Sequence, residues 1–209
     1  MQLISHRGFW RERAEQNTMP AFARSFAGGF GIETDIRDLD GTLVISHDPP
    51  RRGALPFSEL LALHQREGQG VTLALNVKAD GLQPAIAEAV AAAGVTKWFA
   101  FDMSVPDMRP YLAFGTPVFT RHSEVERDPA YYQQSTGVWL DAFEDEWFDE
   151  AVVDAHLASG KQLCLVSPEL HRRPHLPFWD RLAAWPAASS SHLMLCTDFP
   201  DVAQRAFHG

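Results

Sequence analysis

Two acidic residues lie two positions apart in the stretch GIETDIRDLDGTLVISHD, residues 31–48. The apolar residues around Glu33 and Asp35 predict a β-strand, and residues i and i+2 of a strand project from the same face. Arg37 continues the same row. Two neighbouring carboxylates repel each other unless a cation lies between them or one of them is protonated. Arg37 or a divalent metal ion could supply that positive charge.

Two histidines also follow apolar runs. His6 ends the run QLISH and precedes Arg7, and His47 ends LVISH after an Asp-Gly turn. A lone histidine is usually structural, but two histidines, an arginine and an acid pair suit phosphodiester cleavage. One histidine can take a proton from the nucleophile and the other can protonate the leaving oxygen. Arginine can hold the phosphate with paired hydrogen bonds, and a hard divalent ion can neutralise developing charge.

The overall composition excludes several classes of protein. The chain has 209 residues, 45% of them hydrophobic, and a formal net charge of -9, which argues against broad binding to nucleic acid or to anionic membranes. The two cysteines, Cys164 and Cys196, lie in apolar runs and are expected to be plain core residues. We see no secretory signal and no apolar stretch near the ~20 residues of a membrane span, so we expect a cytoplasmic protein.

Short apolar runs alternate with helix-like segments along the whole chain. Strands are expected at 2–6, 30–37, 72–78, 97–102, 117–121, 137–143, 161–167 and 192–198, with a short extra strand at 43–47. Helices are expected at 18–29, 56–65, 82–94, 105–114, 124–135, 146–159 and 177–186, followed by a short tail helix. Eight alternating units predict an α/β fold, a single (β/α)8 TIM barrel over residues 1–209. An open doubly wound sheet is the alternative, although no Gly-x-Gly-x-x-Gly follows any strand.

Polar residues gather at the carboxyl ends of the expected strands, where the active sites of parallel α/β folds lie. These residues are His6, Arg7, Glu33, Asp35, Asn76, Lys78, Asp102, Arg121, Asp141, Glu169 and Asp198. Asp102, Asp141 and Asp198 also suit the simpler role of helix cap.

Four stretches resemble the glycerophosphodiester phosphodiesterases, a family within the wider group related to phosphatidylinositol-specific phospholipase C. They are SHRG at 5–8, QNTMPAF at 16–22, GIETDIRDLDGTLVISHDP at 31–49 and LCTDFPD at 195–201. The resemblance implies that His6 and His47 are the acid/base pair, and that Glu33 and Asp35 bind a divalent metal, Mg²⁺ or Ca²⁺. Arg7 and Lys78 would contact the phosphate. In that family a substrate hydroxyl or water commonly attacks, and no serine or cysteine here stands out as a nucleophile.

The chain departs from the family pattern at two places. Asn76 stands where the family usually has a third carboxylate, two residues before the lysine. An amide oxygen can ligate the metal but brings no charge, so either Asn76 is a weak ligand, or Asp102 supplies the missing charge, or metal dependence is lost. Gln16 stands where the family commonly has glutamate, while Asn17 is retained.

The stretch VSPELHRRP, 166–174, follows an expected strand but lacks the family's usual residues there. We expect Glu169 to line the substrate pocket, and His171, Arg172 and Arg173 to form a solvated loop. Arg121 is a further candidate for substrate contact. His122 and Asp141 are weaker candidates, and Trp139 is expected in the core.

The sequence therefore predicts a metal-dependent hydrolase of small phosphodiesters such as glycerophosphodiesters, without nucleic-acid or stable membrane partners. Two alternatives stay open. One is a barrel that binds phosphate-bearing ligands without turnover. The other is a metal-dependent lyase or isomerase of sugar phosphates, because such enzymes also place acids and histidines at strand ends.

Overall fold

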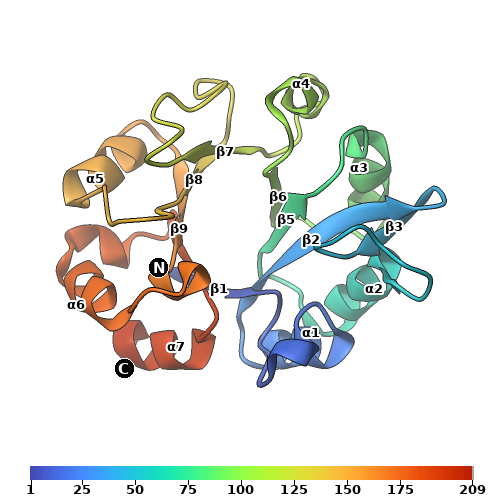
Figure 1. The fold of residues 1–209 in the computed structure, drawn as a ribbon, viewed down its shortest axis with the longest axis horizontal. Helices are drawn as coiled ribbons and strands as arrows, with labels where there is room; N and C mark the ends of the chain where they lie inside the picture. Colours follow the sequence, from blue (N-terminus) through green and yellow to red (C-terminus); the bar gives the residue numbers. More distant parts are fainter. Residues whose placement is uncertain (209) are drawn as a thin grey trace. The chain divides into compact units, whose positions relative to one another are not determined.

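The computed structural model describes residues 1–208 and has an α/β fold (Figure 1). Its contacts divide the chain into two compact units. One comprises residues 5–118, and the other comprises residues 1–4 with the chain from Phe119 onward. Strand β1 (Gln2–His6) contributes residues to both units. No helix in the described part of the chain combines the length and apolarity needed to cross a membrane.

The unit of residues 5–118 carries most of the predicted catalytic residues. Its further strands are β2 (Gly31–Leu39), β3 (Thr42–Ile45), β4 (Leu55–Pro56), β5 (Leu73–Val77) and β6 (Trp98–Phe101). Strands β2, β5 and β6 are parallel, whereas β3 and β4 extend the sheet beside β2 in antiparallel fashion. Its helices are η1 (Arg13–Glu15), α1 (Met19–Ala27), α2 (Phe57–Glu67), α3 (Gln83–Ala92) and α4 (Val105–Ala113).

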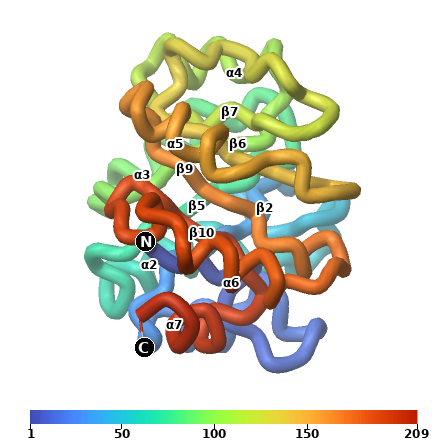
Figure 2. The backbone as a smooth tube through the Cα atoms, turned by 90° about the vertical axis from the view of Figure 1, so that its left-hand side faces the viewer, coloured from blue at the N-terminus to red at the C-terminus, as the bar shows by residue number. Residues whose placement is uncertain are grey.

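The other unit contains four parallel strands, β7 (Phe119–His122), β8 (Gly137–Leu140), β9 (Gln162–Val166) and β10 (Leu193–Thr197). Its helices are α5 (Glu150–Ala158), η2 (Pro168–His171), α6 (Leu176–Ala184), η3 (Pro186–Ser189) and α7 (Pro200–His208). The longer helices α5, α6 and α7 cover one side of these strands and face the viewer in Figure 2.

Continuous apolar runs form the central strands, as expected for parallel strands covered on both faces. Every residue of β5 (LALNV) and β10 (LMLCT) is buried. Cys164 and Cys196 are buried free thiols and Trp139 is 5% exposed, in agreement with their predicted place in the core. Two helices have side-chain N-caps. The side chain of Ser104 accepts a hydrogen bond from the N–H of Asp107 at the start of α4, and the side chain of Asp149 accepts one from the N–H of Val152 at the start of α5.

The order of strands and helices agrees with the sequence prediction except at residues 124–135. The predicted helix there does not form, and the segment consists of turns and bends. Pro129 lies in its middle, lacks an N–H to donate and disfavours helical geometry at the residue before it. Tyr131 has a φ of 52°, which also lies outside a right-handed helix. The short strand β4 and the three short helices η1, η2 and η3 were not predicted.

Hydrogen bonds hold the segment that replaces this helix. Lys161 donates from Nζ to the backbone oxygen of Ser135, at 2.6 Å. His156 lies 2.9 Å from both the hydroxyl of Tyr132 and Nδ1 of His122, so one neutral imidazole bridges the segment to β7. Burial, together with the neighbouring His122 and Lys161, lowers the pKa of His156 to about 4.

The lowered pKa of His156 predicts acid sensitivity. The unfolded chain binds a proton near the ordinary histidine pKa, whereas the folded chain resists protonation until about 4. Stability is therefore lost as the pH falls from the unfolded pKa towards about 4. Urea unfolding of His156→Gln should show a shallower pH dependence in this window than the wild type. The exposed His192 serves as control, and equal slopes for His156→Gln and His192→Gln would contradict the prediction.

Candidate active site

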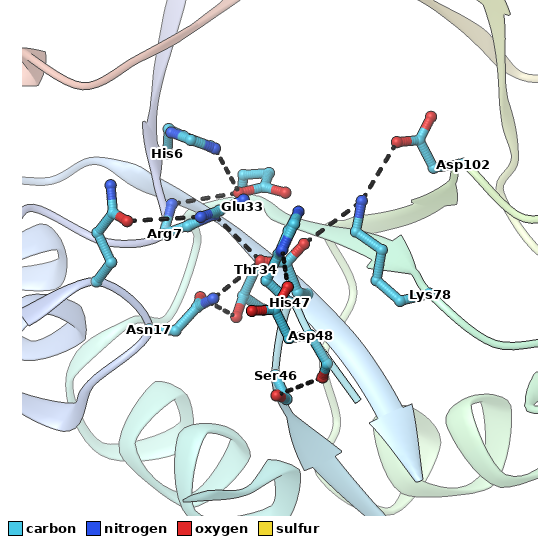
Figure 3. Close-up of polar contacts among 12 residues, drawn as sticks. His6, Arg7, Asn17, Glu33, Thr34, Ser46, His47, Asp48, Lys78 and Asp102 are labelled. Atoms are coloured by element: carbon cyan, nitrogen blue, oxygen red, sulfur yellow. Dashed lines mark hydrogen bonds and ion pairs between the residues drawn. The ribbon is translucent and has the colours of Figure 1, made fainter. Parts of the chain in front are cut away.

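The acid pair on β2 is buried. Glu33 is 2% exposed and Asp35 is 0% exposed, and their alternation along the strand places both on one face. Figure 3 shows Glu33 together with His6, which lies beside it. The repulsion that the sequence predicts between Glu33 and Asp35 therefore exists in the folded chain, because both carboxylates are buried on the same face of one strand.

Three side chains compensate the charge of Asp35. Arg7 places Nε 3.2 Å from Oδ2, and Lys78 places Nζ 3.6 Å from Oδ1. Asn17 donates from Nδ2 to Oδ2 at 2.9 Å. Arg37, which we considered as the neutralising cation, instead donates to the backbone oxygen of His47. The cations come from other strands because Arg7 follows β1 and Lys78 follows β5.

Glu33 resolves the repulsion differently. Burial, followed by repulsion from Asp35, raises the pKa of Glu33 to about 7, although His6, Arg7 and Lys78 act in the opposite direction. The carboxyl accepts a hydrogen bond from the backbone N–H of Arg7 at 3.2 Å, and Nε2 of His6 lies 3.9 Å from it. Near neutral pH this group can therefore hold or release a proton beside an imidazole.

The two predicted acid/base histidines reach this site by different routes. His6 ends β1, where its backbone oxygen accepts from the indole of Trp10, and its ring lies beside Glu33. The β2–β3 hairpin returns the chain to Asp35, because the N–H of Ser46 donates to the backbone oxygen of Asp35 at 3.1 Å. His47 is the next residue. Its half-exposed ring lies 2.9 Å from Oδ1 of Asp48, which fixes the orientation of the imidazole (Figure 3).

Oxygen atoms suited to a hard cation lie across neighbouring strands. Asp35 of β2 pairs in register with Asn76 of β5. Oδ1 of Asp35 and Oδ1 of Asn76 are both buried without a hydrogen-bond donor. Carboxylate and amide oxygens are ligands of Mg²⁺ and Ca²⁺, so Glu33, Asp35 and Asn76 fit such an ion.

Asp102 has another partner. It follows β6 with a φ of 65°, and Lys78 places Nζ 3.7 Å from its carboxylate. Among residues 1–208 no three or more His, Cys, Asp and Glu side chains form a group that could hold a metal. Asp102 thus helps to hold the lysine, and the residue in register with Asp35 on β5 is the neutral Asn76.

Glu169 and Arg121 belong to the other unit. The buried carboxylate of Glu169 accepts from the hydroxyls of Ser167 and Thr197 and from the N–H of Asp198 at 3.0 Å. These bonds tie η2 to the end of β10. Arg121 pairs with Glu126 at 3.5 Å and lies 5.2 Å from the centre of the Phe143 ring.

The stretch after β9 is more ordered than the solvated loop we expected. Pro168–His171 forms the 3₁₀ helix η2, and Nε2 of His171 lies 2.7 Å from the buried carboxylate of Asp141. Arg173 donates to the backbone oxygen of Ala142, and Arg172 is exposed with a φ of 60°. Sequence reasoning missed the pairs Asp141–His171 and His122–His156, because each joins residues about 30 positions apart that no local pattern connects.

No protein-family model and no curated protein sequence matches the chain. Several solved structures do. Glycerophosphodiester phosphodiesterase from Agrobacterium tumefaciens matches with a TM-score of 0.70 and 18% identity over 100% of both chains. An Oleispira antarctica phosphodiesterase, solved with the product sn-glycerol-3-phosphate, matches with a TM-score of 0.70 and 16% identity over 100% of this chain and 97% of its own.

The enzyme from Thermotoga maritima matches with a TM-score of 0.67 and 15% identity over 97% of each chain. These identities are low, so the likeness bears on the fold. It agrees with the resemblance carried by the four sequence motifs and confirms the predicted fold class. The chain thus has the fold of the glycerophosphodiester phosphodiesterases.

Proposed function

We propose that the chain is a phosphoric diester hydrolase that cleaves small glycerophosphodiester-like molecules with the help of a divalent metal. The observation that carries this proposal is the buried pair Glu33 and Asp35, which lies between Arg7 and Lys78 with His6 beside it. The two cations suit a substrate that is an anion, and the carboxylate and amide oxygens beside them suit a cofactor that is a hard cation.

Each residue has a chemical role in this proposal. His6 and His47 move protons to and from the oxygens of the substrate, and Asp48 orients the imidazole of His47. Arg7 and Lys78 attract the phosphate and stabilise the charge that develops on it. Glu33, Asp35 and Asn76 hold Mg²⁺ or Ca²⁺, which when bound polarises the phosphoryl oxygen. A hydroxyl of the substrate or water attacks, so the chain needs no covalent nucleophile.

The glycerol phosphate class of substrate is favoured by one relative. The Oleispira antarctica phosphodiesterase has sn-glycerol-3-phosphate as its product. Arg121 is a further candidate for contact with such a substrate. The contact predicted for Glu169 stays a prediction, because its carboxylate accepts hydrogen bonds from Thr197 and Asp198 at the end of β10.

A neutral residue at position 76, where the family usually has a carboxylate, supports one alternative function. The protein would then bind phosphate-bearing ligands without cleaving them. Such a binder would be stabilised against heat by sn-glycerol-3-phosphate, since a ligand that prefers the folded state raises its stability. It would release no product from glycerophosphodiesters on prolonged incubation with metal.

Removal of the metal should abolish activity. Purified protein is assayed on glycerophosphocholine and on bis-p-nitrophenyl phosphate with Mg²⁺ or Ca²⁺, and we expect hydrolysis that chelator stops and added metal restores. Full activity after complete chelation would show that Arg7 and Lys78 alone supply the positive charge.

Substitution of either histidine should slow the chemical step. We expect His6→Ala and His47→Ala to lower kcat by about 10²- to 10⁴-fold, the usual contribution of a general acid or base. KM should change less, because Arg7 and Lys78 still hold the phosphate. His192→Ala is the matched control on an exposed histidine. Unchanged kcat in both site variants would refute the assigned roles.

Restoring a carboxylate at position 76 should strengthen metal binding. Asn76→Asp adds a negative charge beside Asp35, and we expect Mg²⁺ and Ca²⁺ to bind on the order of tenfold more tightly by titration calorimetry. In chelator the same variant should melt at a lower temperature than the wild type, because three acids then repel one another. Equal affinity in the two proteins would place the metal elsewhere.

A further inference from the structure

Asn17 makes two side-chain hydrogen bonds at the acid pair. Its Nδ2 donates to Oδ2 of Asp35 at 2.9 Å, and its Oδ1 accepts from the hydroxyl of Thr34 at 2.8 Å. The two partners fix the orientation of the amide, because a carboxylate only accepts hydrogen bonds and the hydroxyl must then donate to an oxygen. The side chain therefore bonds two consecutive residues of β2, and Figure 3 shows Asn17 beside the first of them, Thr34.

The backbone of Asn17 is held as firmly as its side chain. Its N–H donates to the backbone oxygen of Arg7 at 2.9 Å, and the N–H of Arg7 in turn donates to the backbone oxygen of Glu33 at 2.9 Å. Arg7 and Asn17 have φ values of 56° and 59°, in the left-handed region. This region is costly for most residues but is tolerated by asparagine, which explains why Asn suits this position.

The consequence concerns the two oxygens of Asp35. Oδ2 accepts a hydrogen bond from Nδ2 of Asn17 and lies 3.2 Å from Nε of Arg7, so both of its partners are side chains of the protein. Oδ1 accepts no hydrogen bond, although Nζ of Lys78 lies 3.6 Å from it, and Oδ1 of Asn76, the residue in register on β5, accepts none either. Without the amide of Asn17, the plane of the carboxylate would lose one of the contacts that hold it, and its second oxygen would no longer be kept at one position.

We propose that Asn17 is a positioning residue: it fixes the carboxylate plane of Asp35 so that one oxygen stays available to the divalent cation. This inference rests on the metal site of the proposed function and adds a residue that does not touch the cation. Residues that orient metal ligands in this way typically change metal affinity by about ten- to a hundredfold when they are substituted.

Two substitutions distinguish the effect of the side-chain amide of Asn17 from the effect of its backbone conformation. Asn17→Gly removes both side-chain bonds and accepts a positive φ without strain, whereas Asn17→Ala removes the same bonds and keeps the strain. Thr18→Ala is the matched control, since it removes the bond from that hydroxyl to the backbone oxygen of Glu15 in the same segment without touching Asp35.

The measurements are titration calorimetry with MgCl₂, CaCl₂ or MnCl₂ alone, and urea unfolding in chelator. We expect Asn17→Gly and Asn17→Ala to weaken metal binding equally, by about ten- to a hundredfold. The unfolding midpoint should fall more in Asn17→Ala than in Asn17→Gly. Thr18→Ala should bind metal as the wild type does, even if its midpoint falls.

Two results would overturn the inference. If metal affinity followed the unfolding midpoint across the variants, so that Asn17→Gly bound nearly as tightly as the wild type, Asn17 would be merely structural. This result leaves the proposed function intact, provided that the wild type binds metal and cleaves phosphodiesters. A wild-type protein that bound none of the three metals would refute the metal site itself and the role of Asn17 with it.

Discussion

The structure around the candidate site depends on one constraint: two carboxylates are buried side by side on a single strand. An unpaired buried charge costs several kcal/mol, so Glu33 and Asp35 can be tolerated only if their charge is compensated or reduced. Both solutions are present. Arg7, Lys78 and Asn17 surround Asp35, while Glu33 has a raised pKa and can carry a proton near neutral pH.

The fold supplies these partners through parallel strands. Strands β2, β5 and β6 run in the same direction, so Asp35, Asn76, Lys78 and Asp102 come to the same edge of the sheet. The backbone also bends sharply at three residues of the site. Arg7, Asn17 and Asp102 all adopt a positive φ without being glycine, and all three contact the acid pair or its lysine. Such strain is found where the surrounding structure enforces it, often at functional sites.

The neutral residue at position 76 is what distinguishes this site from the family pattern that the sequence resembles. With two acids and two permanent cations nearby, the site holds less negative charge than a three-carboxylate site, and a divalent ion should be held less tightly. The orientation of Asp35 then matters more, because a weak site depends on each ligand oxygen being presented correctly. This need gives Asn17 its importance in the metal site that we propose.

The sequence by itself determined the order of the elements and singled out the residues of the candidate site. The alternation of side chains along a strand predicted that Glu33 and Asp35 share one face, and the apolar runs predicted the strands. Both predictions were possible because these signals are local and repeat within a few residues. Only the tertiary structure decided which cation meets which acid. Arg37, nearby in sequence, binds the backbone of His47, whereas Arg7, Asn17 and Lys78 reach Asp35 from other segments. The predicted helix at 124–135 failed for a related reason: Pro129 forbids it locally, and hydrogen bonds from Lys161 and His156 stabilise another path. Pairing between distant segments depends on strand register and backbone geometry, and these are properties of the folded chain.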